Sequence, residues 1–245
     1  MTNITKTVRE IALEQPTSIR VFERLGIDYC CGGRRPLTEA CSERNLEVAD
    51  VVSALNSAAK SAAPAGTDWA KASLRQLIAH IVSTHHEYVK NELPRLAMLA
   101  EKVVNRHGDT QAHLPPLKNV LAQLDEDLTH HLGKEEHILF PFITKLEEAQ
   151  VTNSAAPHGC FGTVTHPIAM MTREHDDAGG LLVQIEQLTS NFTTPEGACP
   201  TYLAFYTGLK EFEQDLHQHI HLENNILFPR AIELEDATLP VEQLY

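Results

Sequence analysis

Residues 127–141 read DLTHHLGKEEHILFP, and residues 215–229 read DLHQHIHLENNILFP. Both copies follow the pattern Asp-Leu-x-x-His-x-x-x-Glu-x-x-Ile-Leu-Phe-Pro. Residues four apart lie one above the other on a single face of an α-helix, about 6 Å apart. Each copy therefore predicts a helix that directs one imidazole and one carboxylate at the same point. The residues concerned are His131 with Glu135, and His219 with Glu223.

A second pair of histidines extends the repeat toward the N-terminus. His86 lies 45 residues before His131, and His175 lies 44 residues before His219. The repeated unit is thus a helix with one histidine, followed by a helix with His-x-x-x-Glu. Two such helical hairpins, with their ligands at matching depths, form a bundle with a site at its centre. The predicted fold class is all-α, a four-helix up-down bundle.

Apolar residues around these positions recur every three or four residues, as expected for helices with one buried face. This spacing predicts long helices at about 69–104, 116–149, 166–190 and 200–234. In the second of these, Leu128 and Ile138 share one stripe with the His-Glu pair. Pro94 is expected to bend or break the first. A carboxylate in an apolar stripe is costly unless it is paired or binds a metal.

The N-terminal part predicts a separate small helical domain at residues 1–58. Short helices are expected at 7–13 and 18–25, and a last one at about 36–55. Residues 59–67 are small and polar and are broken by Pro64 and Gly66, which is typical of a linker. The bundle is then assigned to residues 68–245.

Composition limits the function classes. The net charge of −13 argues against nucleic acid or an anionic membrane as a partner. No apolar run is long enough to cross a membrane, and no signal-peptide pattern opens the chain, so we expect a cytoplasmic protein. Five cysteines, without zinc-like spacing, are expected to be thiols in a reducing compartment.

The predicted ligand set is chemically specific. Four imidazoles and two carboxylates exceed what one structural zinc takes, and they suit two first-row metals, each with two histidines, bridged by Glu135 and Glu223. Iron is the favoured metal, with manganese as the alternative. A single histidine in an apolar stripe is more often a hydrogen-bonded core residue, but the repetition of the whole pattern outweighs that reading.

Other polar residues receive weaker assignments. Asp127 and Asp215 precede the ligand histidines by one turn and are candidates for orienting them or for conducting protons. Glu174 is a candidate for lining access to the site. The remaining histidines are interpreted as surface residues or neighbours of the ligands: His80, His85, His107, His113, His130, His137, His158, His166, His217 and His221.

Cys30 and Cys31 lie in the stretch DYCCGG at residues 28–33. Two small thiols in a tight turn would need no function. The functional alternative is an exposed thiol pair that binds or transfers metal, or exchanges electrons. Gly32 and Gly33 would leave room there for a partner to approach.

Together these motifs resemble a known family. The histidines and the His-x-x-x-Glu pairs resemble the hemerythrin-like domain. The N-terminal Asp-Tyr-Cys-Cys-Gly-Gly resembles the short domain that precedes it in the iron–sulfur cluster repair di-iron proteins, the repair of iron centres family. The resemblance covers nearly the whole chain. Residues 150–165 form a longer loop than the shortest family members have, and this loop holds His158 and Cys160.

The resemblance implies two iron ions in a non-haem centre with an oxo-type bridge. It implies repair of iron–sulfur clusters damaged by nitric oxide or oxidants, by donation of iron to the damaged proteins. It further implies a bacterial cytoplasmic protein, with a homodimer as one assembly. The ligands would be His86, His131, Glu135, His175, His219 and Glu223, with Cys30 and Cys31 in a thiol or iron-transfer role.

Two alternatives to repair remain open. One is a module that reversibly binds O2 or NO, and the other is an enzyme that reduces NO or peroxide at the metal pair. The ligand set permits all three functions, so whether the chain is an enzyme is undecided at this point. The Cys30–Cys31 stretch favours repair, because a gas carrier would not need it.

Overall fold

The computed structural model describes residues 5–60 and 67–238. Every regular element in these residues is helical, which confirms the all-α prediction. No helix among them is both long enough and apolar enough to cross a membrane. The chain divides into two compact units, residues 1–73 with 217–229 and residues 74–216 with 230–245.

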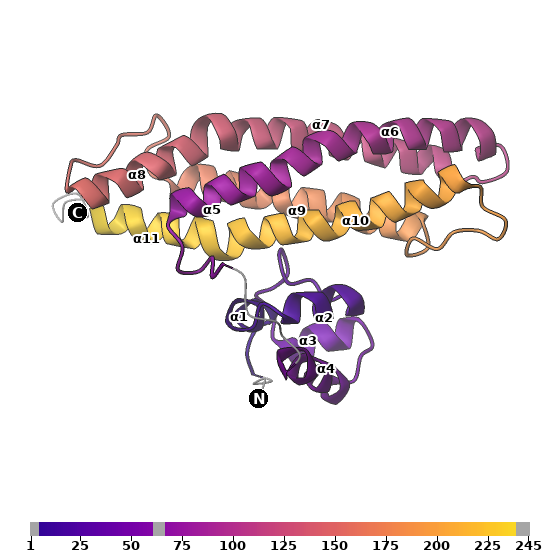
Figure 1. Cartoon of the computed structure of the whole chain (residues 1–245), viewed down its shortest axis with the longest axis horizontal. Helices are drawn as coiled ribbons and strands as arrows, with labels where there is room; N and C mark the ends of the chain where they lie inside the picture. The colour runs from indigo at the N-terminus through magenta and orange to yellow at the C-terminus, as the bar shows by residue number, and fades with distance from the viewer. Residues whose placement is uncertain (1–4, 61–66, 239–245) are drawn as a thin grey trace. The chain divides into compact units, whose positions relative to one another are not determined.

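Residues 74–238 form a set of long helical rods (Figure 1). Three rods are each interrupted by a π-helical turn, and α9 is continuous. The first rod comprises α5 (Leu74–His80), the π-helical turn η1 (Ile81–His86) and α6 (Glu87–His107). The others are α7 (Leu114–Lys134), η2 (Glu135–Leu139) and α8 (Phe140–Thr152); α9 (Thr165–Leu188); and α10 (Pro200–Leu222), η3 (Glu223–Leu227) and α11 (Phe228–Thr238).

These rods alternate in direction (Figure 1). The apolar residues of their stripes are largely buried. α7 contacts both α6 and α9, and α8 contacts α5. α10 lies against α6, since the rings of Tyr88 and Phe212 stack at 6.3 Å. A Cβ on Gly208 of α10 would lie only 2.8 Å from Leu96 Cδ2 of α6. The glycine therefore allows the two helices to approach closely.

The N-terminal residues form four short helices around a core of their own. They are α1 (Val8–Glu14), α2 (Ser18–Leu25), α3 (Leu37–Glu43) and α4 (Val48–Lys60). Thr7 and Glu10 form a reciprocal capping box at the start of α1. The core includes Phe22, Tyr29 and Leu37, all fully or nearly fully buried.

The single helix predicted at 36–55 is in fact two helices. α3 ends at Glu43, and Asn45 adopts a left-handed conformation with φ of 53°. The Leu46 N–H then donates to the Cys41 carbonyl, which closes the end of α3. Asparagine tolerates this conformation better than most residues, so it can end a helix as glycine does. Of the predicted linker 59–67, residues 61–66 lie outside the described residues.

Two of the π-helical turns have a common cause in the repeated Leu-Phe-Pro. The Phe140 N–H donates to the Glu135 carbonyl, five residues earlier, and the Phe228 N–H donates to the Glu223 carbonyl. Pro141 and Pro229 follow directly, and each lacks the N–H that an α-helix would direct at the carbonyl four residues before it. The widened turn avoids the clash between that carbonyl and the proline ring.

The π-turn η2 changes which residues face the core. Ile138, predicted on the buried stripe, is 50% exposed, whereas Leu139 is buried. That prediction was wrong, because it assumed an unbroken α-helical period through residues 135–139. By contrast, Pro94 lies inside α6 without ending it.

Residues 153–164 join α8 to α9 without a helix of their own. The Glu235 carboxylate of α11 accepts the Val164 N–H at 3.0 and 2.9 Å, just before α9 begins. The Phe161 ring meets the Phe142 ring edge-on at 4.8 Å. Cys160 in this loop is exposed. The loop is thus fastened at its C-terminal end to α11 and α8.

Candidate metal centre

The structure brings together the residues that the repeat predicted as ligands. Their donor atoms form two groups, in each of which all atoms lie within 4.8 Å of one another. The first group is His86, Glu135, His219 and Glu223, and the second is His131, Glu135, His175 and Glu223. Glu135 and Glu223 belong to both. These side chains are at most 3% exposed.

The π-turns set the positions of three of these ligands. His86 is the last residue of η1, Glu135 is the first of η2, and Glu223 is the first of η3. Such turns are rare and concentrate at functional sites. Because a π-turn displaces side chains relative to an α-helix, it sets how these residues point into the centre. The sequence alone did not indicate them.

The donor chemistry fits metal ions. The Glu135 side chain is fully buried, and neither of its oxygens accepts a hydrogen bond in the described structure. The Nε2 atoms of His86 and His131 lie 3.5 and 3.4 Å from its Oε2. A buried carboxylate without hydrogen bonds is costly, and a bound cation offsets that cost. The set could hold divalent or trivalent first-row metals.

The second ligand group brings the imidazoles of His131 and His175 close together. Their Nε2 atoms are 3.0 Å apart in the buried interior. In the other group, His219 Nε2 lies 3.0 Å from Glu223 Oε1. Imidazole nitrogens and carboxylate oxygens at such distances around one point form a ligand set without thiolate.

Glu136 orients His86. A carboxylate only accepts, so His86 Nδ1–H donates to Glu136 Oε1 at 2.8 Å, which leaves Nε2 available to a metal. Lys90 donates to the same carboxylate at 2.8 and 3.0 Å. Burial raises the pKa of Glu136, but the hydrogen bonds from Lys90 and His86 outweigh burial, and the pKa is lowered.

Glu174 orients His131 by the same arrangement. His131 Nδ1–H donates to Glu174 Oε2 at 2.9 Å, and Lys134 pairs with the other oxygen. The hydrogen bond from His131, with Lys134 in second place, lowers the pKa of Glu174 to about 2. Each metal group therefore contains one histidine held by a lysine-paired glutamate. Such outer carboxylates fix the ring and its tautomer.

The predicted orienting role of Asp127 and Asp215 was wrong. Asp127 accepts from Gln123 on its own helix, and Asp215 contacts His85 Nδ1 at 2.9 Å, which is not a ligand. Asp127 is thus directed along its own helix, and Asp215 is directed at a histidine of another rod that is not a ligand. The orienting carboxylates come instead from neighbouring rods.

His85 and His221 are buried, at 5% and 4% exposure, although neither lies on the predicted stripes. Burial lowers the pKa of His221 to about 4. His85 lies next to a ligand and His221 lies two residues from one, so both fall off the apolar stripes. The helical period therefore did not predict that they are buried. Their partners, Asp215 and Asn225, become visible only in the fold.

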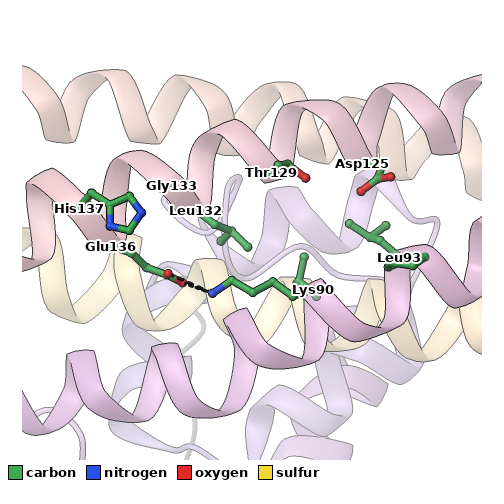
Figure 2. A pocket seen from close by; sticks show the side chains of 10 residues that line it. Lys90, Leu93, Asp125, Thr129, Leu132, Gly133, Glu136 and His137 are labelled. Carbon is green, nitrogen blue, oxygen red and sulfur yellow. Dashed lines mark hydrogen bonds and ion pairs between the residues drawn. The ribbon is translucent and has the colours of Figure 1, made fainter.

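A pocket lies between α6 and α7, beside Glu136 (Figure 2). Its volume is about 360 Å³. The Lys90–Glu136 pair crosses it, and Glu136 in turn contacts His86. One residue thus separates this pocket from a ligand. The pocket is lined by Val89, Lys90, Leu93, Pro94, Asp125, Thr129, Leu132, Gly133, Glu136 and His137.

Cys30 and Cys31 lie in a loop organised by Asp28. The Asp28 carboxylate accepts the N–H groups of Cys30, Cys31 and Gly32 at 2.9, 3.0 and 2.8 Å. The two sulfur atoms are 3.8 Å apart, and neither cysteine is in a disulfide. The hydrogen bond with Cys31 and then burial raise the pKa of the Cys30 thiol. Cys30 is buried and Cys31 is half-buried, so the expected exposure holds only in part.

The fold and the site define a helical-bundle protein with a buried, histidine- and glutamate-lined cation centre. The model of the hemerythrin HHE cation binding domain matches residues 77–231. Residues 4–59 match ScdA_N, a domain of unknown function.

Relatives match over almost the whole chain. The chain is 40% identical over 222 residues to the iron-sulfur cluster repair protein YtfE of Yersinia pseudotuberculosis serotype O:1b (strain IP 31758), which covers 91% of this chain and 94% of the relative. The protein of the same name from Yersinia pestis (strain Pestoides F) is 39% identical with the same coverage. The chain therefore belongs to the hemerythrin-like iron–sulfur cluster repair family, as its motifs predicted.

Proposed function

We propose that this protein repairs iron–sulfur clusters damaged by nitric oxide or oxidants, by donating iron from a centre of two iron ions with an oxo-type bridge. The observation that carries the proposal is the pair of buried ligand groups that share Glu135 and Glu223. Two groups with common carboxylates suit a pair of metal ions rather than one. Relatives that align over 91% of the chain are named iron-sulfur cluster repair proteins.

The roles of the residues follow from the geometry. His86 and His219 would hold one iron and His131 and His175 the other, with Glu135 and Glu223 between them. Bound iron in such a centre supplies redox chemistry and a transferable cation. Glu136 and Glu174 keep the imidazoles of His86 and His131 in the tautomer that presents Nε2. The apolar stripes around the centre exclude water.

Release of the cargo is best gated by reduction. Carboxylate and imidazole ligands hold ferric iron firmly, and the set contains no thiolate to retain ferrous iron. We expect iron to pass from the loaded full-length protein to a chelator that binds both oxidation states. Transfer should be faster after the iron is reduced, and equal rates in the two states would remove the gating.

Donation itself is tested with labelled iron. The full-length protein, loaded with an iron isotope, is incubated with an iron–sulfur protein whose cluster nitric oxide has damaged. We expect the isotope in the restored cluster. A cluster restored with unlabelled iron contradicts donation. Sustained turnover of NO to N2O with an electron supply would favour the enzymatic alternative, and reversible O2 or NO binding without iron transfer would favour the carrier.

Cys30 and Cys31 are proposed to act in transfer. In cells, the double variant Cys30→Ser/Cys31→Ser should lose cluster repair while it keeps its iron. Intact repair would strengthen the carrier and enzyme alternatives. The proposal places the protein in the cytoplasm, where these thiols stay reduced. It assigns residues 1–58 as the thiol domain and 68–245 as the iron domain, and it includes damaged iron–sulfur proteins and a second copy of this chain as partners.

A further inference from the structure

The residues around Asn225 connect the thiol loop to a turn that holds metal ligands. Asn225 lies within η3, two residues after Glu223, and the whole residue is 6% exposed. The segment 217–229 belongs to the same compact unit as the N-terminal residues. Contacts within that unit run from Asn225 to Tyr29, which directly precedes Cys30.

The amide nitrogen of Asn225 makes this connection. Its Nδ2 donates to the Tyr29 carbonyl at 3.1 Å and lies 2.8 Å from His221 Nδ1. An amide nitrogen has two hydrogens and accepts none, so both are used. His221 Nδ1 is then an acceptor, and its ring meets the Tyr29 ring edge-on at 5.4 Å. The amide therefore holds the loop by its backbone.

The Asn225 backbone makes a second connection. Pro229 lacks the N–H that an α-helix would direct at the Asn225 carbonyl. Arg9 Nη2 donates to this carbonyl instead, at 3.2 Å. The Arg9 N–H also donates to the Gly33 carbonyl at 2.7 Å, at the far end of the thiol loop. Arg9 thus links η3 to both α1 and the loop.

The loop is tightly built around the same Tyr29 carbonyl. A Cβ on Gly33 would lie 2.5 Å from that oxygen, so only glycine fits there. The Asp28 carboxylate accepts the N–H groups of the three residues after Tyr29, which are Cys30, Cys31 and Gly32. Movement of Cys30 and Cys31 therefore requires the Tyr29–Asn225 hydrogen bond to adjust or break.

We propose that Asn225 is a positioning residue that couples the Cys30–Cys31 thiols to the metal ligands of η3. Metal held by Glu223 restrains the turn, the turn keeps the Tyr29 carbonyl in place, and the thiols stay shielded. Reaction at the thiols loosens the turn and weakens the hold on metal. The inference deepens the proposed function, since it presupposes that the ligand groups bind iron.

The first test measures thiol reactivity. N-ethylmaleimide adds to a thiol with a new S–C bond, and the thiol proton ends on the adjacent carbon. The rate at Cys30 and Cys31 is followed by mass spectrometry of their peptide, in the full-length protein with and without iron. We expect iron to slow modification by about fivefold or more, a common size for coupling between two sites.

Asn225→Ala should abolish most of that difference. The matched control is His137→Ala, because His137 occupies the same position after Glu135 in the first copy and is exposed. The control should keep the whole difference. Equal rates with and without iron in the unmodified sequence, or a full difference in Asn225→Ala, would overturn the coupling.

A second variant covers the case in which Asn225→Ala fails to fold or bind iron. Arg9→Ala removes the hydrogen bond to the Asn225 carbonyl and replaces no ligand. It should reduce the iron-dependent difference at unchanged iron content, and an undiminished difference would count against the proposal. Because alkylated thiols cannot return to the shielded position, prior alkylation of the unmodified sequence should weaken iron binding. A chain that takes up no iron at all refutes the proposed function instead.

Discussion

Glu174 shows at the scale of one residue how the centre depends on pH. Its pKa is lowered from the ordinary 4.5 to about 2, first by the hydrogen bond from His131. A carboxyl with a lowered folded-state pKa adds stability that is present above the unfolded pKa and is lost as the pH falls through the folded one. The window for this loss is therefore between pH 4.5 and 2.

Glu174→Gln should destabilise the iron-free protein by about 1–2 kcal/mol at pH 6, allowing for the partial exposure of the carboxylate. Because the unmodified protein loses the same contribution in acid, the two stabilities should converge as the pH falls from 5 to 3. Urea unfolding at each pH measures the gap. The control is Glu148→Gln, an exposed carboxylate on α8. A gap that stays constant over this range would contradict the assignment.

The ligands could be predicted from the sequence, whereas the carboxylates that orient them could not. The six candidate ligands were visible because each occurs in a repeat with fixed spacing, and they gather in the structure. Glu136 was not singled out, and Glu174 was expected only to line an access path. Their function depends on a histidine in another rod, and that distance is set by how the helices pack, which a helical period does not encode.

At the scale of elements, the prolines after the ligand glutamates are the decisive feature. Pro141→Ala would restore an N–H at the position that an α-helix needs, so η2 could close to an α-helical turn. We expect Glu135 to turn from the centre and metal affinity to fall by about tenfold or more. Pro94→Ala in α6, also a proline inside a helical rod, should keep the affinity. Competition with a metal indicator measures both, and equal affinities in the two variants would disprove this role of Pro141.

Replacing a glycine by alanine should have opposite effects on stability in α10 and in α9. A Cβ on Gly208 would meet Arg95 Nη2 at 2.5 Å and Leu96 Cδ2 at 2.8 Å, whereas a Cβ on Gly180 meets nothing within 4 Å. Gly208→Ala should cost about 1–2 kcal/mol by overpacking. Gly180→Ala should add about 0.5–1 kcal/mol, because alanine loses less backbone entropy in a helix. Urea unfolding gives both values, and effects of the same sign would show that the α6–α10 contact is not tight.

The sequence predicted the long helices but not the interruptions between and within helices. The long rods were predictable because their stripes keep a regular period. The break between α3 and α4 was missed, because Asn45 ends a helix without glycine or proline to signal it. Ile138 was misplaced because a π-turn resets the period, and the proline that causes it stands three residues later.

For the whole molecule, metal removal should be the largest perturbation. Free iron at about a hundredfold over its dissociation constant adds about 2.7 kcal/mol, which raises Tm by roughly 5–10 °C. A chelator should reverse that gain in thermal unfolding. In Glu135→Gln/Glu223→Gln the iron-dependent gain should vanish. The iron-free form of this variant should be more stable than the unmodified iron-free protein, because two buried carboxylates are gone. A variant that still gains stability with iron would contradict the ligand assignment.

The division of the ligands between the two copies of the repeat has a consequence for biosynthesis. Each metal group takes two side chains from residues before 136 and two from residues after 174. While the ribosome is still translating the later half, the emerging chain owns only His86, His131 and Glu135, half of what either ion requires. A metal group of this kind can therefore be completed only after the second copy of the repeat has been synthesised.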